Sequence, residues 1–199
     1  LTDTFASSFA AYPSSANFAE SRLYVEYQED VFVGYRYFET IPGAAASVCY
    51  PFGYGLSYTT FALSDVRGGM NGAGEIALSA TVTNTGLCAG KYVLQAYVNP
   101  PKGRIAKPAA ALVGFAKTRL LEPNESETLT VSFAPSAFAT YDDEGAVRKS
   151  AYVLEKGAYG FRVGENVRET VNVDYRYELD DDAILEQLSP KCAPTLLHR

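Results

Sequence analysis

Between residues 59 and 178 the sequence consists largely of short segments in which apolar and polar side chains alternate, separated by clusters of turn-forming residues. In the clearest of these, Val171, Val173, Tyr175 and Tyr177 fall on one side, and segments 76–82, 92–98 and 129–133 repeat the pattern. A period of two residues is typical of a strand with one buried and one solvated face. About seven or eight such strands, joined by turns, predict a two-sheet antiparallel sandwich of about 100 residues.

The composition supports a mainly β fold. The chain has 15 Tyr, 11 Phe and 16 Gly but only 1 Met and no Trp, a mixture that favours strands and turns over a helix bundle. We therefore expect an immunoglobulin-like or fibronectin type III-like antiparallel β-sandwich. An irregular N-terminal extension and a short C-terminal helix or linker flank it.

The two flanks differ from the alternating region. Residues 1–58 have little periodicity, although residues 31–38 (VFVGYRYF) read as a strand that needs a partner sheet. Residues 50–58 (YPFGYGLSY) contain two glycines, which permit tight turns, between aromatic residues. We expect these aromatic rings to be buried against another surface. After residue 178, Asp180–Asp182 could cap a short helix over residues 183–188. The expected units are thus 1–58, 59–178 and 179–199.

Length and charge exclude several classes of protein. The 199 residues allow one domain and a remainder but not an α/β barrel enzyme. Residues 1–5 (LTDTF) show neither an initiator Met nor a signal peptide, so we expect a segment of a longer chain. A net charge of −6 without any basic run excludes nucleic acid as a partner. No apolar stretch approaches the ~18 residues of a membrane span, so no membrane partner is expected either.

Cysteine and histidine offer no catalytic or metal-binding pattern. Cys49, Cys88 and Cys192 are too far apart for a zinc or redox motif, so we expect free thiols, with one disulfide as the open alternative. Free thiols favour a reducing compartment, such as the cytoplasm of a bacterium. The one histidine, His198, lies beside the chain end, where a preorganised catalytic triad is not expected.

Carboxylates are the remaining candidates for catalysis, because two of them ~5–10 Å apart suffice for glycoside hydrolysis. The candidates are Glu26, Glu29, Asp30, Asp142, Asp143, Glu144 and Asp180–Asp182. The last two clusters fall in turn-like or cap-like contexts, and residues 142–145 lack the ligand spacing of an EF-hand loop. The glycine-rich residues 68–74 precede a strand and predict a hairpin, not a phosphate loop. We therefore predict no catalytic residue, metal or cofactor.

Aromatic side chains on a sandwich face can stack on sugar rings, as in carbohydrate-binding modules. Tyr97, Phe115 and Tyr141 are the candidates. Because most aromatic residues follow the inward alternation, core packing is the preferred interpretation.

Two runs carry a resemblance to a known family. Residues 30–38 (DVFVGYRYF), followed by 50–61 (YPFGYGLSYTTF), resemble the segment that joins the second and third domains of family 3 glycoside hydrolases, the β-glucosidase family. Downstream motifs resemble that family's fibronectin type III-like domain: 82–86 (VTNTG), 89–91 (AGK), 95–98 (QAYV), 107–108 (KP), 112–115 (LVGF), 121–126 (LEPNES) and 157–164 (GAYGFRVG). Residues 1–5 look like the last strand of the preceding α/β sandwich domain. The resemblance covers residues 1–177.

The resemblance implies a parent enzyme that removes terminal β-linked glucosyl residues by a retaining mechanism. The family's nucleophilic Asp belongs to a Ser-Asp-Trp-type motif of a barrel domain, and its general acid/base Glu to the α/β domain. Neither motif occurs here, so no catalytic residue is carried over. The tail 180–199 resembles the linker of permuted members, in which the barrel follows.

Two functions remain open from the sequence. In the first, the chain is a non-catalytic module that packs against neighbouring α/β sandwich and barrel domains and stabilises them. In the second, it is a carbohydrate-binding module that holds β-glucan or cello-oligosaccharide near them. The aromatic stretch 31–58 favours the first, because such a patch is a liability when exposed and is expected in an interface.

Overall fold

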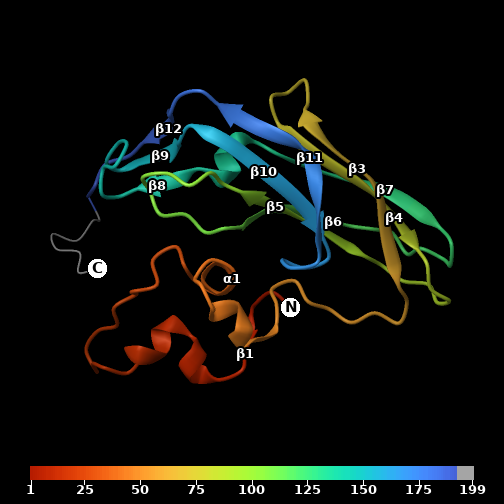
Figure 1. Cartoon of the computed structure of the whole chain (residues 1–199), viewed down its shortest axis with the longest axis horizontal. Helices are drawn as coiled ribbons and strands as arrows, with labels where there is room; N and C mark the ends of the chain where they lie inside the picture. Colours follow the sequence, from red (N-terminus) through yellow and green to blue (C-terminus); the bar gives the residue numbers. More distant parts are fainter. Residues whose placement is uncertain (192–199) are drawn as a thin grey trace.

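The computed structural model describes residues 1–191, and its main body is a sandwich of two antiparallel sheets (Figure 1). One sheet has the order β3-β4-β7 and the other the order β11-β10-β5-β6. The first sheet consists of β3 (Phe61–Met70), β4 (Ile76–Asn84) and β7 (Ser126–Phe133). The second consists of β5 (Val93–Asn99), β6 (Ala111–Lys117), β10 (Gly157–Gly164) and β11 (Thr170–Leu179). The predicted fibronectin-like sandwich is therefore confirmed.

The alternating residues form the core between the two sheets. In β4, Ile76, Leu78, Ala80 and Val82 are completely buried, whereas the residues between them are only partly covered. They pack with the inward residues of β5 and β10 and with Phe138, which lies in the short 3₁₀ helix η4 (Pro135–Phe138). The glycine-rich residues 68–74 end β3 and turn into β4, as the predicted hairpin requires.

A third, small sheet contains the first correction. It has the order β12-β9-β8, with β8 (Thr140–Asp142), β9 (Ala151–Leu154) and β12 (Ala183–Gln187). The prediction of a helix over 183–188 was wrong, because this segment pairs with β9 as an edge strand. Six residues are too few for a stable isolated helix, whereas strand pairing satisfies their backbone groups at once. Asp182 caps no helix and instead accepts the backbone N–H of Lys156 at 2.9 Å.

The N-terminal extension, residues 1–58, lies beneath the sandwich in Figure 1 and is irregular, as predicted. Its elements are β1 (Phe5–Ala6), η1 (Phe9–Ala11), η2 (Pro13–Ala16), α1 (Tyr35–Phe38), η3 (Ala44–Ser47) and β2 (Val48–Tyr50). β1 pairs with β2.

The predicted strand over 31–38 was also wrong. Gly34 has φ 57° and ψ −130°, a conformation that favours glycine, and the chain then forms the single helical turn α1. The turn buries Phe38, whose ring meets that of Tyr12 edge to face at 5.6 Å. Density of aromatic and β-branched residues thus marked burial here and not strand pairing.

Candidate domain interface

A second, smaller core joins the extension to the outer face of the four-stranded sheet. Because Ala96 and Val98 of β5 face the main core, Tyr97 points to the opposite side of the sheet, where it is completely buried. The ring centroid of Tyr35 lies 6.3 Å from that of Tyr97, and the centroid of Phe52 lies 4.5 Å from that of Tyr35. Burial raises the pKa of the Tyr97 phenol well above its ordinary value. Tyr97 is therefore a core residue, as expected, and not a sugar platform.

Hydrogen bonds fasten the same contact at two places. The Tyr35 hydroxyl accepts the backbone N–H of Leu112 at 2.9 Å, and the Phe52 carbonyl accepts that of Val167 at 3.0 Å. The first bond satisfies an N–H of the edge strand β6, and the second satisfies one in the loop between β10 and β11, so the extension completes part of the polar bonding of the sandwich.

An ion pair adds to these bonds. Arg168, in the loop between β10 and β11, donates to Glu39 at 2.8 Å and to the carbonyl of Ala45 at 3.1 Å. Thr40 accepts the N–H of Ala109 at 2.8 Å. The extension is thus held to the sandwich along α1 and the residues after it.

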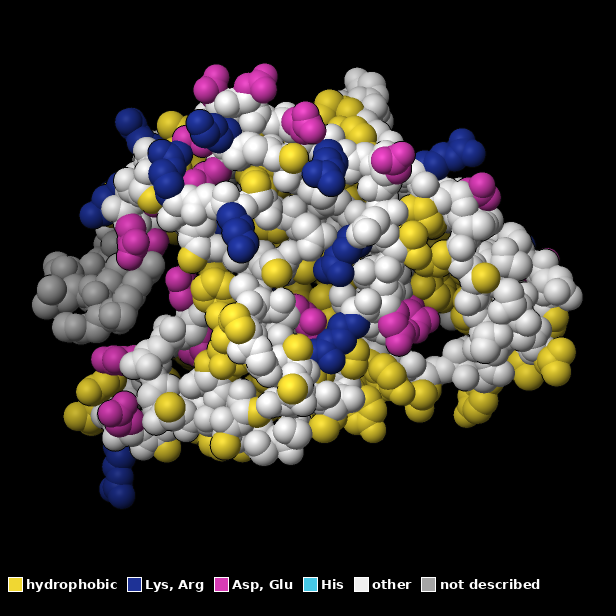
Figure 2. Space-filling model, viewed as in Figure 1, with side chains coloured by type: hydrophobic (Ala, Val, Ile, Leu, Met, Phe, Trp, Pro, Cys, Tyr) yellow, Lys and Arg dark blue, Asp and Glu magenta, His cyan; other side chains and the backbone are white. Residues whose placement is uncertain are grey.

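Much of the surface that the extension exposes is apolar. Among the described residues, twelve of the twenty-two exposed large hydrophobic side chains belong to residues 1–58. They are Leu1, Phe5, Phe9, Phe18, Leu23, Tyr24, Val25, Tyr27, Val33, Tyr50, Leu56 and Tyr58. Figure 2 shows hydrophobic side chains along the lower edge of the molecule, where the extension lies. We call this set of twelve side chains the apolar face.

One end of the apolar face reaches the sandwich. Leu56 and Tyr58 are 90% and 98% exposed, and Leu87, in the turn after β4, is 94% exposed. The hydroxyl of Thr59 donates to Asn84 at 2.6 Å, which ties the linker to this turn. Three almost fully exposed hydrophobic residues therefore stand on neighbouring segments.

Two of the candidate carboxylates form hydrogen bonds or ion pairs that stabilise the fold. Asp142 is buried and accepts four backbone N–H groups, from Gly145 to Arg148, at 2.7–3.0 Å. Burial works to raise the pKa of Asp142, but these four bonds outweigh it and lower the pKa. Asp182 is paired with Arg104.

Several other candidates come together at one cleft. Asp30, Asp142, Asp143 and Glu144 line a cleft of about 140 Å³ together with Arg104. No group of three or more His, Cys, Asp or Glu suited to a metal ion occurs within residues 1–191. Glu26 is exposed and Glu29 is half-buried, and both lie in the extension, outside any strand.

Two carboxylate sites were not predicted from the sequence. Glu155 is 3% exposed and forms an ion pair with Lys107, and it also accepts the backbone N–H of Arg104 at 2.7 Å and that of Ile105 at 3.2 Å. Burial tends to raise the pKa of Glu155, but the bonds from Lys107 and the two amides lower it. This buried carboxylate fixes the loop between β5 and β6.

The other site is a carboxyl pair in the loop after β10. A hydrogen bond with Glu169, together with burial and the charge of Glu169, raises the pKa of Glu165 to about 7. Split carboxyl pKa values are a mark of acid/base pairs in enzymes. Here, however, the two carboxyl groups are in hydrogen-bond contact, whereas a retaining glycosidase keeps them ~5 Å apart around the scissile bond.

The remaining candidates are dispersed. Phe115 is 68% exposed on β6, whereas Tyr141 on β8 is 37% exposed and packs on Tyr152 at 5.4 Å, so they share no platform. Cys49 and Cys88 are free and exposed. Cys192 and His198 lie outside the described residues. Within residues 1–191 no helix has the length and apolarity needed to span a membrane.

The sandwich, the second core and the apolar face define a fibronectin type III-like domain that carries a fixed, partly apolar extension. The family model for the fibronectin type III-like domain matches residues 92–167. β-Glucosidase A of Butyrivibrio fibrisolvens is 49% identical over 99% of this chain. A β-glucosidase structure from Paenibacillus barengoltzii superposes with a TM-score of 0.91 at 46% identity over 98% of the chain. A GH3 β-glucosidase structure from Bifidobacterium adolescentis gives a TM-score of 0.76 at 35% identity over 86%.

The chain belongs to the family 3 glycoside hydrolases, as the segment that contains their fibronectin type III-like domain. It spans about a quarter of the length of the proteins it matches: 25% of the Butyrivibrio protein, 22% of the Paenibacillus chain and 25% of the Bifidobacterium chain.

Proposed function

We propose that the chain is a non-catalytic docking module of a β-glucosidase, and that its apolar face packs against the α/β sandwich and barrel domains of the same enzyme. The observation that carries the proposal is that the extension is both fixed and exposed. The second core and Arg168 fix it to the sandwich, and the same extension exposes twelve large hydrophobic side chains.

The length of the matching enzymes supports other domains of the same enzyme as the docking partner. The matching enzymes are about four times as long as this chain, and the relatives named above are β-glucosidases. A large apolar surface on a monomer is a liability, whereas the same surface is ordinary inside an interdomain contact. The units 1–58 and 59–178 then correspond to the docking segment and the sandwich, and β12 attaches residues 183–187 to the sandwich as well.

The proposed role of the module is to position the catalytic domains, without taking part in a chemical step. Retaining hydrolysis needs two carboxylates on opposite sides of a glycosidic bond, and small displacements of either one are costly in rate. We propose that the sandwich holds the neighbouring domains so that their carboxylates meet. The 199-residue chain alone is expected to hydrolyse no aryl-β-glucoside, and a turnover abolished by substitution of one of its carboxylates would contradict this.

Recombining the parts tests the docking role. The 199-residue chain and the remainder of the parent enzyme are expressed separately, mixed, and followed by size-exclusion chromatography and β-glucosidase activity. We expect co-elution and a gain in activity. The double variant Leu56→Ser/Tyr58→Ser should weaken association at least tenfold, because it removes two exposed anchors without touching either core.

Phe115→Ser is the matched control, since Phe115 is also exposed but lies on β6 and outside the apolar face. It should leave association unchanged. Equal weakening by Phe115→Ser, or a remainder that is fully active and stable alone, would overturn the proposal.

A further inference from the structure

A polar trough crosses the half of the four-stranded sheet that the extension leaves open. A cavity of about 760 Å³ lies over β10 and β11, and a second of about 510 Å³ continues it toward Glu39 of the extension. The two share Asn99 and Asn172 as lining residues, so they form one groove. The volume of each falls in the range of small-molecule sites, ~300–1,000 Å³.

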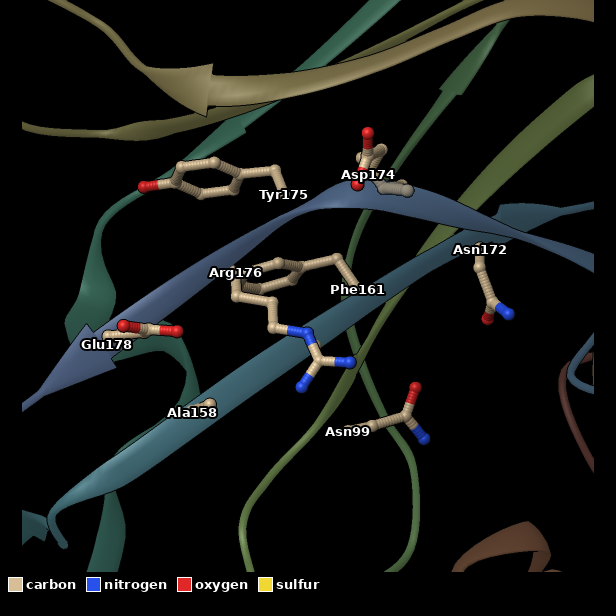
Figure 3. A pocket seen from close by; sticks show the side chains of 10 residues that line it. Asn99, Ala158, Phe161, Asn172, Asp174, Tyr175, Arg176 and Glu178 are labelled. Carbon is tan, nitrogen blue, oxygen red and sulfur yellow. The ribbon is translucent and has the colours of Figure 1, made fainter.

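The register of the strands explains the shape of the trough. Gly160 of β10 is paired with Arg176 of β11 on one side and with Asn99 of β5 on the other. Because neighbouring strands are ~4.8 Å apart, Asn99 and Arg176 are separated by roughly 10 Å, with no side chain between them. Figure 3 shows the side chain of Arg176 reaching from β11 across β10 toward Asn99.

Gly160 lies beside a register shift between β10 and β11, but neither space nor backbone conformation requires glycine at this position. A Cβ built there would meet no atom within 4 Å, and its φ lies outside the left-handed region. Glycine in a strand costs stability relative to residues with side chains. A strand glycine marks a bulge or a place where a ligand or another backbone approaches closely, and the free space above Gly160 leaves room for a ligand beside the bulge.

The polar groups around the trough are fixed on one side and free on the other. Asn99 donates to the carbonyl of Ala109 at 2.6 Å and accepts from Arg162 at 2.9 Å, so its amide is held in one orientation. Within the described part of the chain, the side chains of Asn172 and Arg176 make no hydrogen bond. Fixed and free donors and acceptors are thus presented together.

The charges around the whole groove balance. Its lining contains three guanidinium and three carboxylate groups: Arg162, Arg168 and Arg176, and Glu39, Asp174 and Glu178. A balanced set of donors and acceptors matches hydroxyl groups, each of which both donates and accepts, better than it matches an anion. The aromatic lining residues are Phe161, which belongs to the main core, and Tyr175, which packs against that core, so the groove lacks the apolar centre of a protein interface.

We infer that this trough is a binding site for an uncharged saccharide, with the sugar lying over Gly160 between Asn99 and Arg176. The inference goes beyond the docking role, and only the choice of β-linked glucosyl sugars as ligand rests on it. The site is on the sandwich and does not include the apolar face. The failure of one proposal therefore leaves the other standing.

The test uses the 199-residue chain titrated with cellobiose and cellotetraose and followed by amide chemical shifts in NMR spectra. We expect saturable shifts at residues 158–162 and 172–178 in the millimolar range or tighter. Gly160→Val should weaken binding at least tenfold and leave the thermal midpoint unchanged or higher, because the new side chain fills the trough without a clash.

Gly69→Val is the matched control. Gly69 also lies in a strand, β3, with no atom within 4 Å of a built Cβ, but on the other sheet. This variant should bind cellobiose as the unmodified chain does. The inference is overturned if the sugars give no saturable shifts, if Gly160→Val binds as tightly as Gly69→Val, or if sulfate displaces the sugar and binds more tightly.

Discussion

Replacement of Phe52 by alanine tests how far the second core fixes the extension to the sandwich. The ring of Phe52 packs against that of Tyr35 with centroids 4.5 Å apart, and the carbonyl of Phe52 accepts the N–H of Val167. Truncation of a fully buried phenylalanine costs about 3–5 kcal/mol. Phe52 is only partly buried, so we expect about 2 kcal/mol, a value that includes the loss of the ring contact.

The location of this loss is the informative part. The main core does not contain Phe52, so the change should promote local detachment of the extension and not unfolding of the sandwich. Native-state hydrogen exchange measures this directly. About 2 kcal/mol corresponds to roughly 30-fold faster exchange at the amides of Leu112 and Val167, which the extension protects. The amide of Leu78, in the main core, should exchange as before.

Phe18→Ala serves as the control, because Phe18 is 61% exposed in the same extension and lies outside the second core. It should change exchange at Leu112 and Val167 less than threefold. The reasoning is refuted if Phe52→Ala leaves the exchange of these two amides unchanged, or if it accelerates Leu78 to the same degree.

Three further changes probe buried charge and pH. Asp142→Asn should cost about 2 kcal/mol in urea unfolding at pH 7. Because the folded pKa of Asp142 is lowered, this stability is complete above the unfolded pKa of ~3.9 and is lost as pH falls through the folded pKa. A cost that stays constant as the pH is lowered towards the acid unfolding limit would contradict this. The pKa of Glu165 is raised to about 7, so the free energy of unfolding falls as pH rises from ~4.3 to 7. Glu165→Gln should therefore raise the free energy of unfolding by about 0.5 kcal/mol, after solvent screening, at pH 8 but not at pH 4. The measurement is the thermal midpoint at the two pH values. Lys107→Met leaves Glu155 buried without its main partner and should lower the free energy of unfolding by about 3 kcal/mol. Adding Glu155→Gln to this variant should restore part of the lost stability. No restoration would argue against a charge effect.

The sandwich could be predicted from the sequence because strands such as β4 and β11 have one face in the main core and one face outside it. Ile76–Val82 and Val173–Tyr177 show the alternation that the packing of two sheets requires, whereas Val171 at the start of β11 is exposed and β5 is buried on both faces. The errors concern segments whose partners decide their structure. Residues 183–188 carry a weak helical pattern, but the free edge of β9 makes them a strand. Residues 31–38 are apolar enough for a strand, yet Gly34 turns the chain into α1.

The candidate interface was predicted in outline only. The aromatic runs indicated that residues 31–58 pack against another surface, and part of them packs against Tyr97. The pair of Lys107 and Glu155 could not be predicted, because it joins residues 48 apart in sequence and depends on the folded loop. The same holds for Gly160, whose significance comes from its cross-strand neighbours Asn99 and Arg176.

Hydroxyl-radical footprinting of the complete enzyme against the 199-residue chain tests the docking role most directly. In the isolated chain the side chains of Tyr27 and Tyr58 are 86% and 98% exposed and should oxidise readily. If the apolar face packs against the catalytic domains, both should react at least fivefold more slowly in the complete enzyme, while Phe115 on β6 keeps its reactivity. Equal oxidation of Tyr27 and Tyr58 in the two samples would contradict the account.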